Sequence, residues 1–362
     1  MDNFFEARLE KVRAEMARKR LSGLIICDPQ SIFYLTGVKN EPYERLYALF
    51  IAPSGRPKLF LNRLFTCTDG DFDVIWYNDT DDATKILAQN IVQTGVIGVD
   101  KIFPARFLIP LMIGVKGAKF LVGSACVDSV RACKDEKEQL LMKEASRIND
   151  ICIQRAFDFI REGITEVEVA DYIRACFREE GADGESFDTI VSFGANAADP
   201  HHEPDRTVLK DGDCVLIDMG CKKDGYCADM TRTAFFRSAD DEAVKIHDIV
   251  RQANEKAESI IAPGVKFADI DAAARDIINA AGYGEHFTHR LGHFIGQSEH
   301  ESGDVSAANQ ESAKEGMIFS IEPGIYLPGK FGVRIEDLVL VTANGCQRLN
   351  LVDKHYHFLG LK

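Results

Sequence analysis

Two aspartates stand in a stretch that otherwise has the pattern of two paired β-strands. Residues 214–220 are apolar and β-branched, residues 222–225 have turn composition, and residues 226–236 alternate again as a strand does, which predicts a β-hairpin. A turn centred between Lys223 and Asp224 would place Asp218 directly opposite Asp229. Like charges roughly 5 Å apart on neighbouring strands repel each other unless a cation lies between them. The hairpin therefore predicts a bound divalent metal ion; the alternative is a register slip that turns one acid to solvent.

Histidines gather in a second stretch. His289, His293 and His300 fall within twelve residues, although the chain has only 9 histidines. Gly292 and Gly296 favour a strand or loop there over a helix. A lone histidine is usually structural, whereas three beside glycines indicate a functional site.

Two glutamates stand in apolar runs farther along. Glu322 ends the run 317–322, and Glu336 lies inside the run 333–341, two residues after Arg334 and so on the same strand face. A carboxylate in an apolar strand must be paired or metal-bound. Two Asp, two Glu and at least one His suit two divalent ions such as Mn, Co or Zn better than one structural zinc. Two ions can share a water, lower its pKa and polarise a carbonyl, which predicts a dinuclear hydrolase.

Composition limits the remaining possibilities. A chain of 362 residues is long enough for two domains. The net charge of -14 argues against a nucleic-acid partner or an anionic membrane surface. Residues 1–20 have the pattern of an amphipathic helix and not of a signal peptide, and no apolar run approaches membrane-spanning length. We therefore expect a cytoplasmic protein.

The chain has 10 cysteines but no CxxC pair. In the absence of an export signal, we expect them to be reduced and mostly buried. Cys214, Cys221 and Cys227 flank the acidic hairpin, but thiolates favour a softer, closed site than two carboxylates imply.

The pattern of elements predicts two different domains. Residues 1–130 alternate strand-like runs with helix candidates such as 82–92 and 104–113, which is α/β patterning. From residue 131 to residue 362, helices and antiparallel strands fall in separate runs, which predicts an α+β domain. Two capping boxes, Asp135 with Glu138 and Thr165 with Glu168, predict helices that end near residues 160 and 180. Helix pairs followed by strands occur twice, which would fit a weak internal two-fold repeat.

The motifs around these residues resemble those of the creatinase and prolidase group of metallopeptidases, which share the pita-bread fold with methionine aminopeptidase. The closest resemblance is to Xaa-Pro dipeptidase (prolidase) and Xaa-Pro aminopeptidase (aminopeptidase P). It rests on IDMG with Asp218, ADMTRT with Asp229, HRLGHFIG with His293, SIEPG with Glu322 and GVRIED with Glu336. Residues 27–37, CDPQSIFYLTG, resemble the group's first domain. The resemblance implies a creatinase-like N-terminal domain over residues 1–130 and a pita-bread catalytic domain over residues 131–362.

The resemblance also implies roles for individual residues. Asp218 would bind one ion, His293 and Glu322 the other, and Asp229 and Glu336 would bridge both. His201, His300 and His289 would contact the substrate or the transition state. Glu322 would also relay the proton of the attacking water, and Arg334 would support the ligands or contact the substrate. The sequence departs from the usual pattern at Asp199 and His202, on either side of the Pro200–His201 pair.

The implied activity is two-metal-assisted hydrolysis of the bond between an N-terminal residue and a following proline. The substrates would be peptides with proline at the second position, and the resemblance suggests a homodimer. Two alternatives are a pita-bread protein that no longer catalyses and acts as a binding module, and another hydrolase of the same fold. The choice between dipeptides and longer peptides, the native metal, the dimer surface and the effect of Asp199 and His202 stay open at this point.

Overall fold

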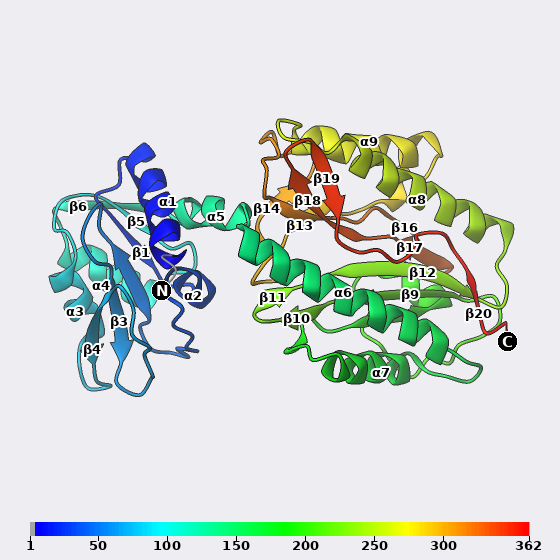
Figure 1. Cartoon of the computed structure of the whole chain (residues 1–362), viewed down its shortest axis with the longest axis horizontal. Coiled ribbons are helices and arrows are strands. Elements are labelled where there is room, and N and C mark those ends of the chain that lie inside the picture. Colours follow the sequence, from blue (N-terminus) through cyan, green and yellow to red (C-terminus); the bar gives the residue numbers. More distant parts are fainter. Residues whose placement is uncertain (1–3, 362) are drawn as a thin grey trace. The chain divides into compact units, whose positions relative to one another are not determined.

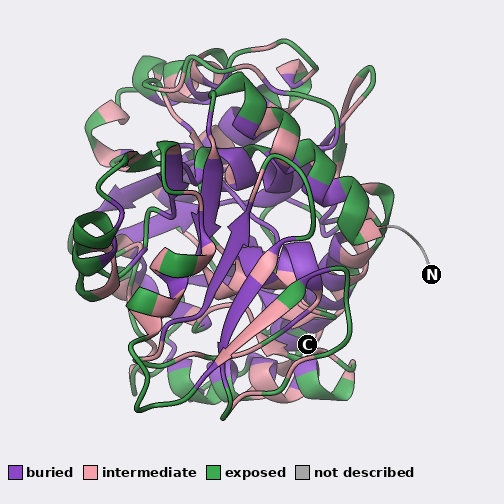
Figure 2. Ribbon diagram, turned by 90° about the vertical axis from the view of Figure 1, so that its left-hand side faces the viewer, coloured by how far each residue is buried: buried purple, intermediate pink, exposed green. Residues whose placement is uncertain are grey.

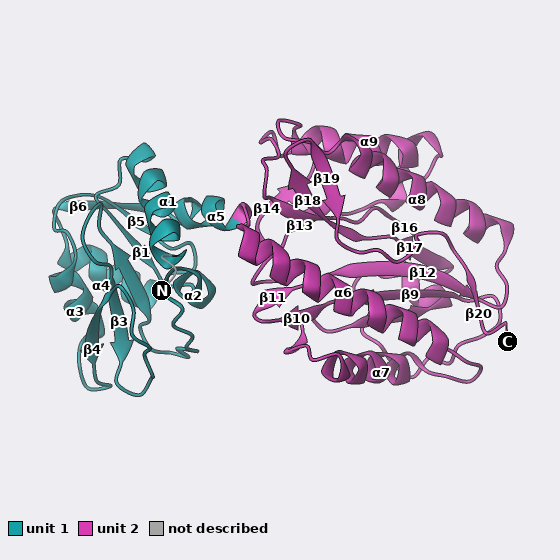
Figure 3. Ribbon diagram, viewed as in Figure 1, with its two compact units in different colours: residues 1–131 teal, residues 132–362 magenta. Residues whose placement is uncertain are grey.

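The structure is a computed structural model that describes residues 4–361, and it divides into two compact units, residues 1–131 and 132–362 (Figures 1 and 3). Each unit has hydrophobic cores of its own. Buried residues, purple in Figure 2, fill the strands, and exposed residues, green, lie in loops and on the outer faces of helices.

The first unit is an α/β layer structure around one mixed sheet with the strand order β4-β3-β2-β1-β5-β6. Alternate residues of β1 face opposite cores, since Leu24 and Ile26 pack on one side and Ile25 on the other. This confirms the predicted α/β class. The elements are α1 (Phe4–Arg18), β1 (Gly23–Ile26), α2 (Pro29–Thr36), β2 (Ala48–Ile51), β3 (Lys58–Asn62), β4 (Asp73–Tyr77), α3 (Ala83–Asn90), β5 (Gly95–Val99), α4 (Ala105–Gly114), β6 (Ala118–Val122) and α5 (Ala125–Ala132).

Most elements of this unit agree with the sequence pattern, but two helices were not predicted. The expected N-terminal helix is α1, although residues 1–3 of that prediction lie outside the described residues. The two helices that were not predicted are α2 and α5, which have eight residues each. A start signal is nevertheless present at α2, because the Asp28 side chain accepts hydrogen bonds from the first helical N–H groups and Pro29 occupies the first turn.

The second unit pairs two helices with each of two sheets. Helices α6 (Glu136–Phe159) and α7 (Glu166–Glu179) share a core with β9 (Cys214–Met219) and β12 (Met230–Phe236). Helices α8 (Asp241–Ile260) and α9 (Phe267–Ala280) share a core with β15 (Ile318–Ile321) and β18 (Asp337–Thr342). Helices and antiparallel strands in separate layers confirm the predicted α+β class. Both predicted capping boxes are present, at the starts of α6 and α7.

The remaining elements complete two larger sheets and two small ones. The larger sheets have the orders β20-β12-β9-β8 and β14-β13-β15-β18-β19. The elements are β7 (Gly184–Glu185), β8 (Ile190–Phe193), the 3-10 helix η1 (Gly194–Ala198), β10 (Cys221–Lys223), β11 (Tyr226–Cys227), the 3-10 helix η2 (Gly284–His286), β13 (Gly292–Phe294), β14 (Glu301–Val305), β16 (Gly324–Leu327), β17 (Phe331–Arg334), β19 (Gly345–Arg348) and β20 (Phe358–Leu359).

The predicted register of the acidic hairpin is wrong by two residues. Asp218 pairs with Thr231, and Lys223 pairs with Tyr226, so the turn consists of Asp224 and Gly225. Both turn residues have positive φ, 49° and 82°, as the two-residue hairpin turn favoured by Asp-Gly requires. A shift of two residues leaves each side chain on the same face of the sheet. Asp218 and Asp229 therefore still point the same way, although they are not directly opposite.

The run 333–341 is also not one strand, as predicted, but two. β17 ends at Arg334 and β18 begins at Asp337, so Glu336 lies in the interruption. Asp229 lies in the interruption between β11 and β12, and Glu322 lies between β15 and β16. At such a break a side chain is released from the strict alternation of the ladder, so carboxylates from different strands can converge.

All 10 cysteines are reduced thiols, as expected, and seven of them are buried. The Cys214 and Cys221 thiols donate to backbone carbonyls of Gly194 and Ala145, and the Cys227 thiol donates to that of Gln297. None of the three is a ligand candidate in the structure. Over residues 4–361, no helix is both long enough and apolar enough to cross a membrane.

The Asp-Gly turn yields a stability prediction. Gly225→Ala should lower the free energy of unfolding by about 1 kcal/mol, because an alanine at φ of 82° is strained. Urea denaturation monitored by circular dichroism measures this change. Gly345→Ala is the control, since Gly345 also lies in a hairpin but has no positive φ and ample space for a Cβ atom. An equal effect of the two substitutions would contradict the assigned turn.

Candidate metal centre and active site

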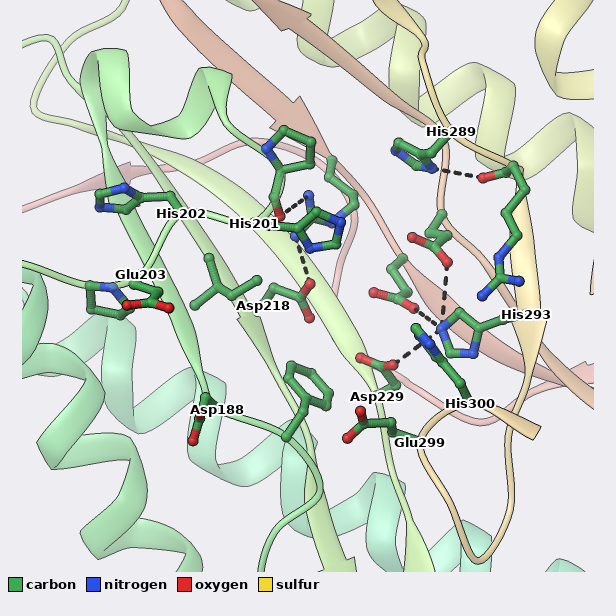
Figure 4. A pocket seen from close by; sticks show the side chains of 18 residues that line it. Asp188, His201, His202, Glu203, Asp218, Asp229, His289, His293, Glu299 and His300 are labelled. Carbon is green, nitrogen blue, oxygen red and sulfur yellow. Dashed lines mark hydrogen bonds and ion pairs between the residues drawn. The ribbon is translucent and has the colours of Figure 1, made fainter. Parts of the chain in front are cut away.

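One cavity of about 460 Å³ in the second unit brings all nine predicted site residues together (Figure 4). They come from five separate segments of the chain, which the two larger sheets and their connections hold in place. Nine further residues complete the lining, and sequence reasoning had not singled out most of them as site residues. The lining is Phe187, Asp188, Ile190, Pro200, His201, His202, Glu203, Pro204, Asp218, Asp229, His289, Arg290, His293, Glu299, His300, Glu322, Arg334 and Glu336.

The His293 imidazole lies at the centre of the acidic residues. Its Nε2 atom is 3.5 Å from Asp229 Oδ2, 3.5 Å from Glu322 Oε1 and 3.9 Å from Glu336 Oε1. Ligand atoms of Asp229, His293 and Glu336 all lie within 4.8 Å of one another, and all three residues are buried. This is a spacing from which one cation could be bound by three side chains at once.

Several carboxylate oxygens in this cluster are buried without a partner. Asp218 Oδ1, Asp229 Oδ1 and Glu336 Oε1 accept no hydrogen bond from any residue that the structure describes. Burial raises the pKa of Asp229 and of Glu336 well above the usual range, and the negative charge of Asp218 raises that of Asp229 further. Burial also raises the pKa of Glu322 to about 7. Since unsatisfied, mutually repelling carboxylates are costly inside a protein, these residues fit bound divalent cations.

Arg334 links Asp218 to Glu336 through hydrogen bonds, and the side chains that take part besides these three were not predicted from the sequence. Its guanidinium donates to Asp218 Oδ2 at 2.6 Å and to the Thr231 hydroxyl at 3.1 Å. That hydroxyl in turn donates to Glu336 Oε2 at 2.8 Å. Tyr326 accepts a hydrogen bond from Arg334 at 2.9 Å. Thr231 pairs with Asp218 across the ladder between β9 and β12, so the two side chains lie on the same face of the sheet.

The structure separates the roles of the two adjacent histidines. His201 is directed towards the centre of the cavity, whereas His202 turns away from it (Figure 4). His202 Nε2 lies 2.7 Å from Glu166 Oε2, and Glu166 also accepts hydrogen bonds from the backbone N–H groups of Phe193 and Asp205. Glu166, His202 and Asp205 are close enough to hold an ion. Direct hydrogen bonds already satisfy Glu166, so this group holds the loop that carries His201.

The other two histidines are uncharged at neutral pH. Burial lowers the pKa of His289 to about 4, and its Nε2 atom lies 2.9 Å from the Tyr326 hydroxyl. Burial also lowers the pKa of His300 to about 4, and the positive charge of Arg290 adds to this effect. The His300 ring lies 4.1 Å from that of His293, centroid to centroid. Both ring nitrogens of His289 have partners within the protein, whereas a neutral His300 beside the cavity can hydrogen-bond a peptide without adding positive charge.

Comparison with known proteins identifies the family. Residues 140–343 match the family model described as metallopeptidase family M24, and residues 8–133 match the creatinase/prolidase N-terminal domain. The chain belongs to metallopeptidase family M24. It is therefore a metallopeptidase of a metal-dependent family, and the predicted combination of a creatinase-like N-terminal domain with a pita-bread catalytic domain is confirmed.

Relatives of this M24 protein resemble it over nearly its whole length. An uncharacterised peptidase of Staphylococcus saprophyticus is 38% identical over 359 residues, covering 96% of this chain and 100% of the relative. The crystal structure of dipeptidase PepE from Mycobacterium ulcerans is 31% identical with a TM-score of 0.92, covering 100% of both chains. A prolidase from Thermococcus sibiricus is 34% identical with a TM-score of 0.91, covering 99% of this chain and 100% of the other.

The Thr231 hydroxyl provides a test of the hydrogen bonds that join Arg334 to Glu336 in this M24 protein. Thr231→Val keeps the side-chain volume but removes the link between Arg334 and Glu336, so the affinity for a divalent metal should fall about 10- to 100-fold. Isothermal titration calorimetry with Mn²⁺ measures this change. Thr233→Val is the control, because that hydroxyl bonds only the backbone of Arg334. Unchanged affinity in Thr231→Val would contradict the proposed support.

The raised carboxyl pKa values predict how stability depends on pH in the metal-free M24 chain. Folding takes up protons where a carboxyl pKa is higher in the folded chain than in the unfolded chain. The contribution of Glu322 to the free energy of unfolding is therefore complete below about pH 4.5 and is lost as the pH rises through about 7. The melting temperature of chelated protein should fall over this range, and Mn²⁺ should abolish the fall. Glu322→Gln should make it shallower. Identical pH profiles with and without metal would contradict this account.

Proposed function

We propose that this M24 protein is a dinuclear metal-dependent peptidase that hydrolyses the bond between an N-terminal residue and a following proline. The observation that carries the proposal is the set of buried carboxylate oxygens around His293 that accept no hydrogen bond from the described residues, at a cavity that four further histidines line. Four carboxylates and one imidazole suit a pair of borderline or hard divalent ions.

The proposed metal ligands are the five residues on which the family motifs centre. Asp218 would hold one ion, His293 and Glu322 the other, and Asp229 and Glu336 would bridge them. Manganese suits the oxygen-rich donor set best, with cobalt or zinc as alternatives. When bound, the ions supply Lewis acidity towards the peptide carbonyl and lower the pKa of the attacking water.

The other side chains supply proton transfer and hydrogen bonds. Glu322, whose carboxyl group lines the cavity, would accept the proton of the attacking water and pass it to the prolyl nitrogen. His201 and His300 would donate hydrogen bonds to the oxygen that gains negative charge. His289, which the Tyr326 hydroxyl orients, would contact the substrate. Arg334 would hold Asp218 and Glu336 in position.

The preference for proline rests on the relatives and on the chemistry of the bond. A structure 27% identical to this chain, with a TM-score of 0.90 and 98% of this chain covered, is an Xaa-Pro dipeptidase from Bacillus anthracis. The Thermococcus sibiricus relative is a prolidase. An X-Pro bond has no N–H group and a fixed φ, so its hydrolysis requires a dedicated pocket. A homodimer and a cytoplasmic location remain predictions.

Peptide hydrolysis tests the proposal. Xaa-Pro and Xaa-Pro-Yaa peptides and matched Xaa-Ala controls are incubated with chelated protein, before and after Mn²⁺, Co²⁺ or Zn²⁺ is added. We expect cleavage only before proline and only after a metal is restored. Metal binding without cleavage of any proline peptide would contradict the proposal and favour a binding module. Cleavage of non-proline amides alone would favour another hydrolase of the fold.

Asp229→Asn tests the bridging assignment separately. The substitution keeps the shape of the side chain but removes the charge proposed to link both ions, so metal-dependent hydrolysis should fall by at least about 1,000-fold, or roughly 4 kcal/mol in transition-state free energy. Circular dichroism should show an unchanged fold. Asp171→Asn on the exposed face of α7 is the matched control and should keep full activity. Normal turnover by Asp229→Asn would contradict the assignment.

A further inference from the structure

We infer that Lys134 is a positioning residue for the candidate active site, because its ion pair with Glu301 holds the loop that carries His300. The inference goes beyond the proposed function, since it assigns a role to two residues outside the cavity. It also rests on that function, in which His300 contacts the oxygen that gains negative charge.

The loop in question is the segment 295–300, which joins β13 to β14 and has neither helical nor strand structure. Glu299 and His300 of this loop line the cavity, and the His300 ring lies 4.1 Å from that of the proposed ligand His293 (Figure 4). A loop lacks the regular hydrogen bonds that fix a strand, so the position of its side chains depends on contacts with other elements.

Glu301, the first residue of β14, provides one such contact. Successive side chains of an extended chain point in opposite directions, so the Glu301 carboxylate turns away from the cavity that His300 lines. Its Oε1 atom accepts a hydrogen bond from the Gln297 N–H at 3.0 Å, and its Oε2 atom accepts one from Lys134 Nζ at 3.1 Å. Gly296 leaves room for this carboxylate, because a Cβ atom there would lie 2.7 Å from Glu301 Oε1. One side chain therefore both closes the loop and ties it to Lys134.

The ion pair is almost completely buried. The side chain of Lys134 is 1% exposed and that of Glu301 is 6% exposed. Exposed ion pairs contribute little to stability, whereas either partner of a buried pair is costly when it is left alone. The backbone of Lys134 is also fixed, since its N–H donates to the Gly316 carbonyl at 2.7 Å and its carbonyl accepts from Gln139 Nε2 at 2.9 Å. Lys134 is therefore a fixed point for the loop.

The other end of the loop is connected to the same part of the fold. The Gly296 carbonyl accepts a hydrogen bond from the Cys227 N–H at 2.7 Å. The neighbouring Tyr226 donates its hydroxyl to Glu138 Oε1 at 2.9 Å, and Glu138 belongs to the capping box in the first turn of α6. In Figure 1, β11 and β14 lie near the start of this helix. Because α6 shares a core with β9 and β12, both ends of the loop are positioned by a rigid element.

Removal of the lysine charge has a specific consequence. Without Lys134, the buried Glu301 carboxylate must take up a proton or move towards water. Either change weakens the link that holds His300 in place. Since His300 is proposed to stabilise the transition state and not to bind the substrate beforehand, kcat should fall while KM changes little.

Hydrogen exchange measures the position of the loop independently of activity. In chelated protein, Lys134→Met should increase the exchange rate of residues 295–300 at least about tenfold, and that of α9 should not change. Lys134→Arg, which keeps the charge, should restore protection. Lys256→Met, at an exposed lysine of α8, is the control and should change nothing.

A second variant guards against a failure to fold. Lys134→Met combined with Glu301→Gln leaves no unpaired buried charge, so it should fold normally by circular dichroism but still lack the ion pair. Its loop should exchange as fast as that of Lys134→Met. Unchanged protection of residues 295–300 in the combined variant would overturn the inference.

A double-mutant cycle tests whether the pair acts through His300. In the metal-loaded enzyme, Lys134→Met should lower kcat for an Xaa-Pro dipeptide at least about tenfold and leave KM within about threefold. In His300→Ala enzyme, the same substitution should lower kcat less than about twofold, because the side chain through which it acts is absent. Equal losses in both backgrounds would overturn the inference, since they would indicate a general loss of structure. If the unmodified enzyme cleaves no proline peptide, the proposed function fails and the hydrogen-exchange result alone decides whether Lys134 positions the loop.

Discussion

Repulsion among buried carboxylates is the constraint on which the catalytic unit depends. Asp229, Glu322 and Glu336 lie within a few ångströms of one imidazole, and burial raises the pKa of each. A chain folds in this way only if the surrounding framework is rigid enough to hold like charges together. Two sheets, each covered by a pair of helices, provide that framework, and each of the three acids is placed at an interruption between two strands.

A second buried network, whose side chains do not line the cavity, fixes the backbone at Glu336. Arg232 donates to the Glu336 carbonyl at 2.6 Å and to Asp337 at 2.7 Å. Lys354 lies 2.8 Å from Asp337 and 2.7 Å from Glu258. Buried charges are tolerated only when they are paired and hydrogen-bonded. These pairs join β12, α8 and the C-terminal segment behind Glu336, so the position of the metal-facing carboxylate depends on charges far along the sequence.

The sequence predicted which types of residue form the candidate site better than it predicted how the strands place them. Unusual acids in apolar strands and clustered histidines pointed to most of the predicted site residues, because a polar residue that breaks an apolar pattern is conspicuous. His201, which lies in a loop, was predicted only through the resemblance to the prolidase group. The register of the hairpin was wrong, although the Asp224-Gly225 pair was a readable signal for a two-residue turn. Thr231 and Tyr326 were missed because a buried hydroxyl resembles an ordinary strand residue until its partners are known.

The central claim is that cations offset the repulsion among these carboxylates. The most direct test is a crystal structure of the Mn²⁺-loaded protein, with anomalous diffraction data collected on both sides of the manganese absorption edge. The account predicts two manganese peaks, both in contact with Asp229 and Glu336, one also with Asp218 and the other with His293 and Glu322. A cavity without an anomalous peak, or manganese bound only at Glu166, His202 and Asp205, would contradict it.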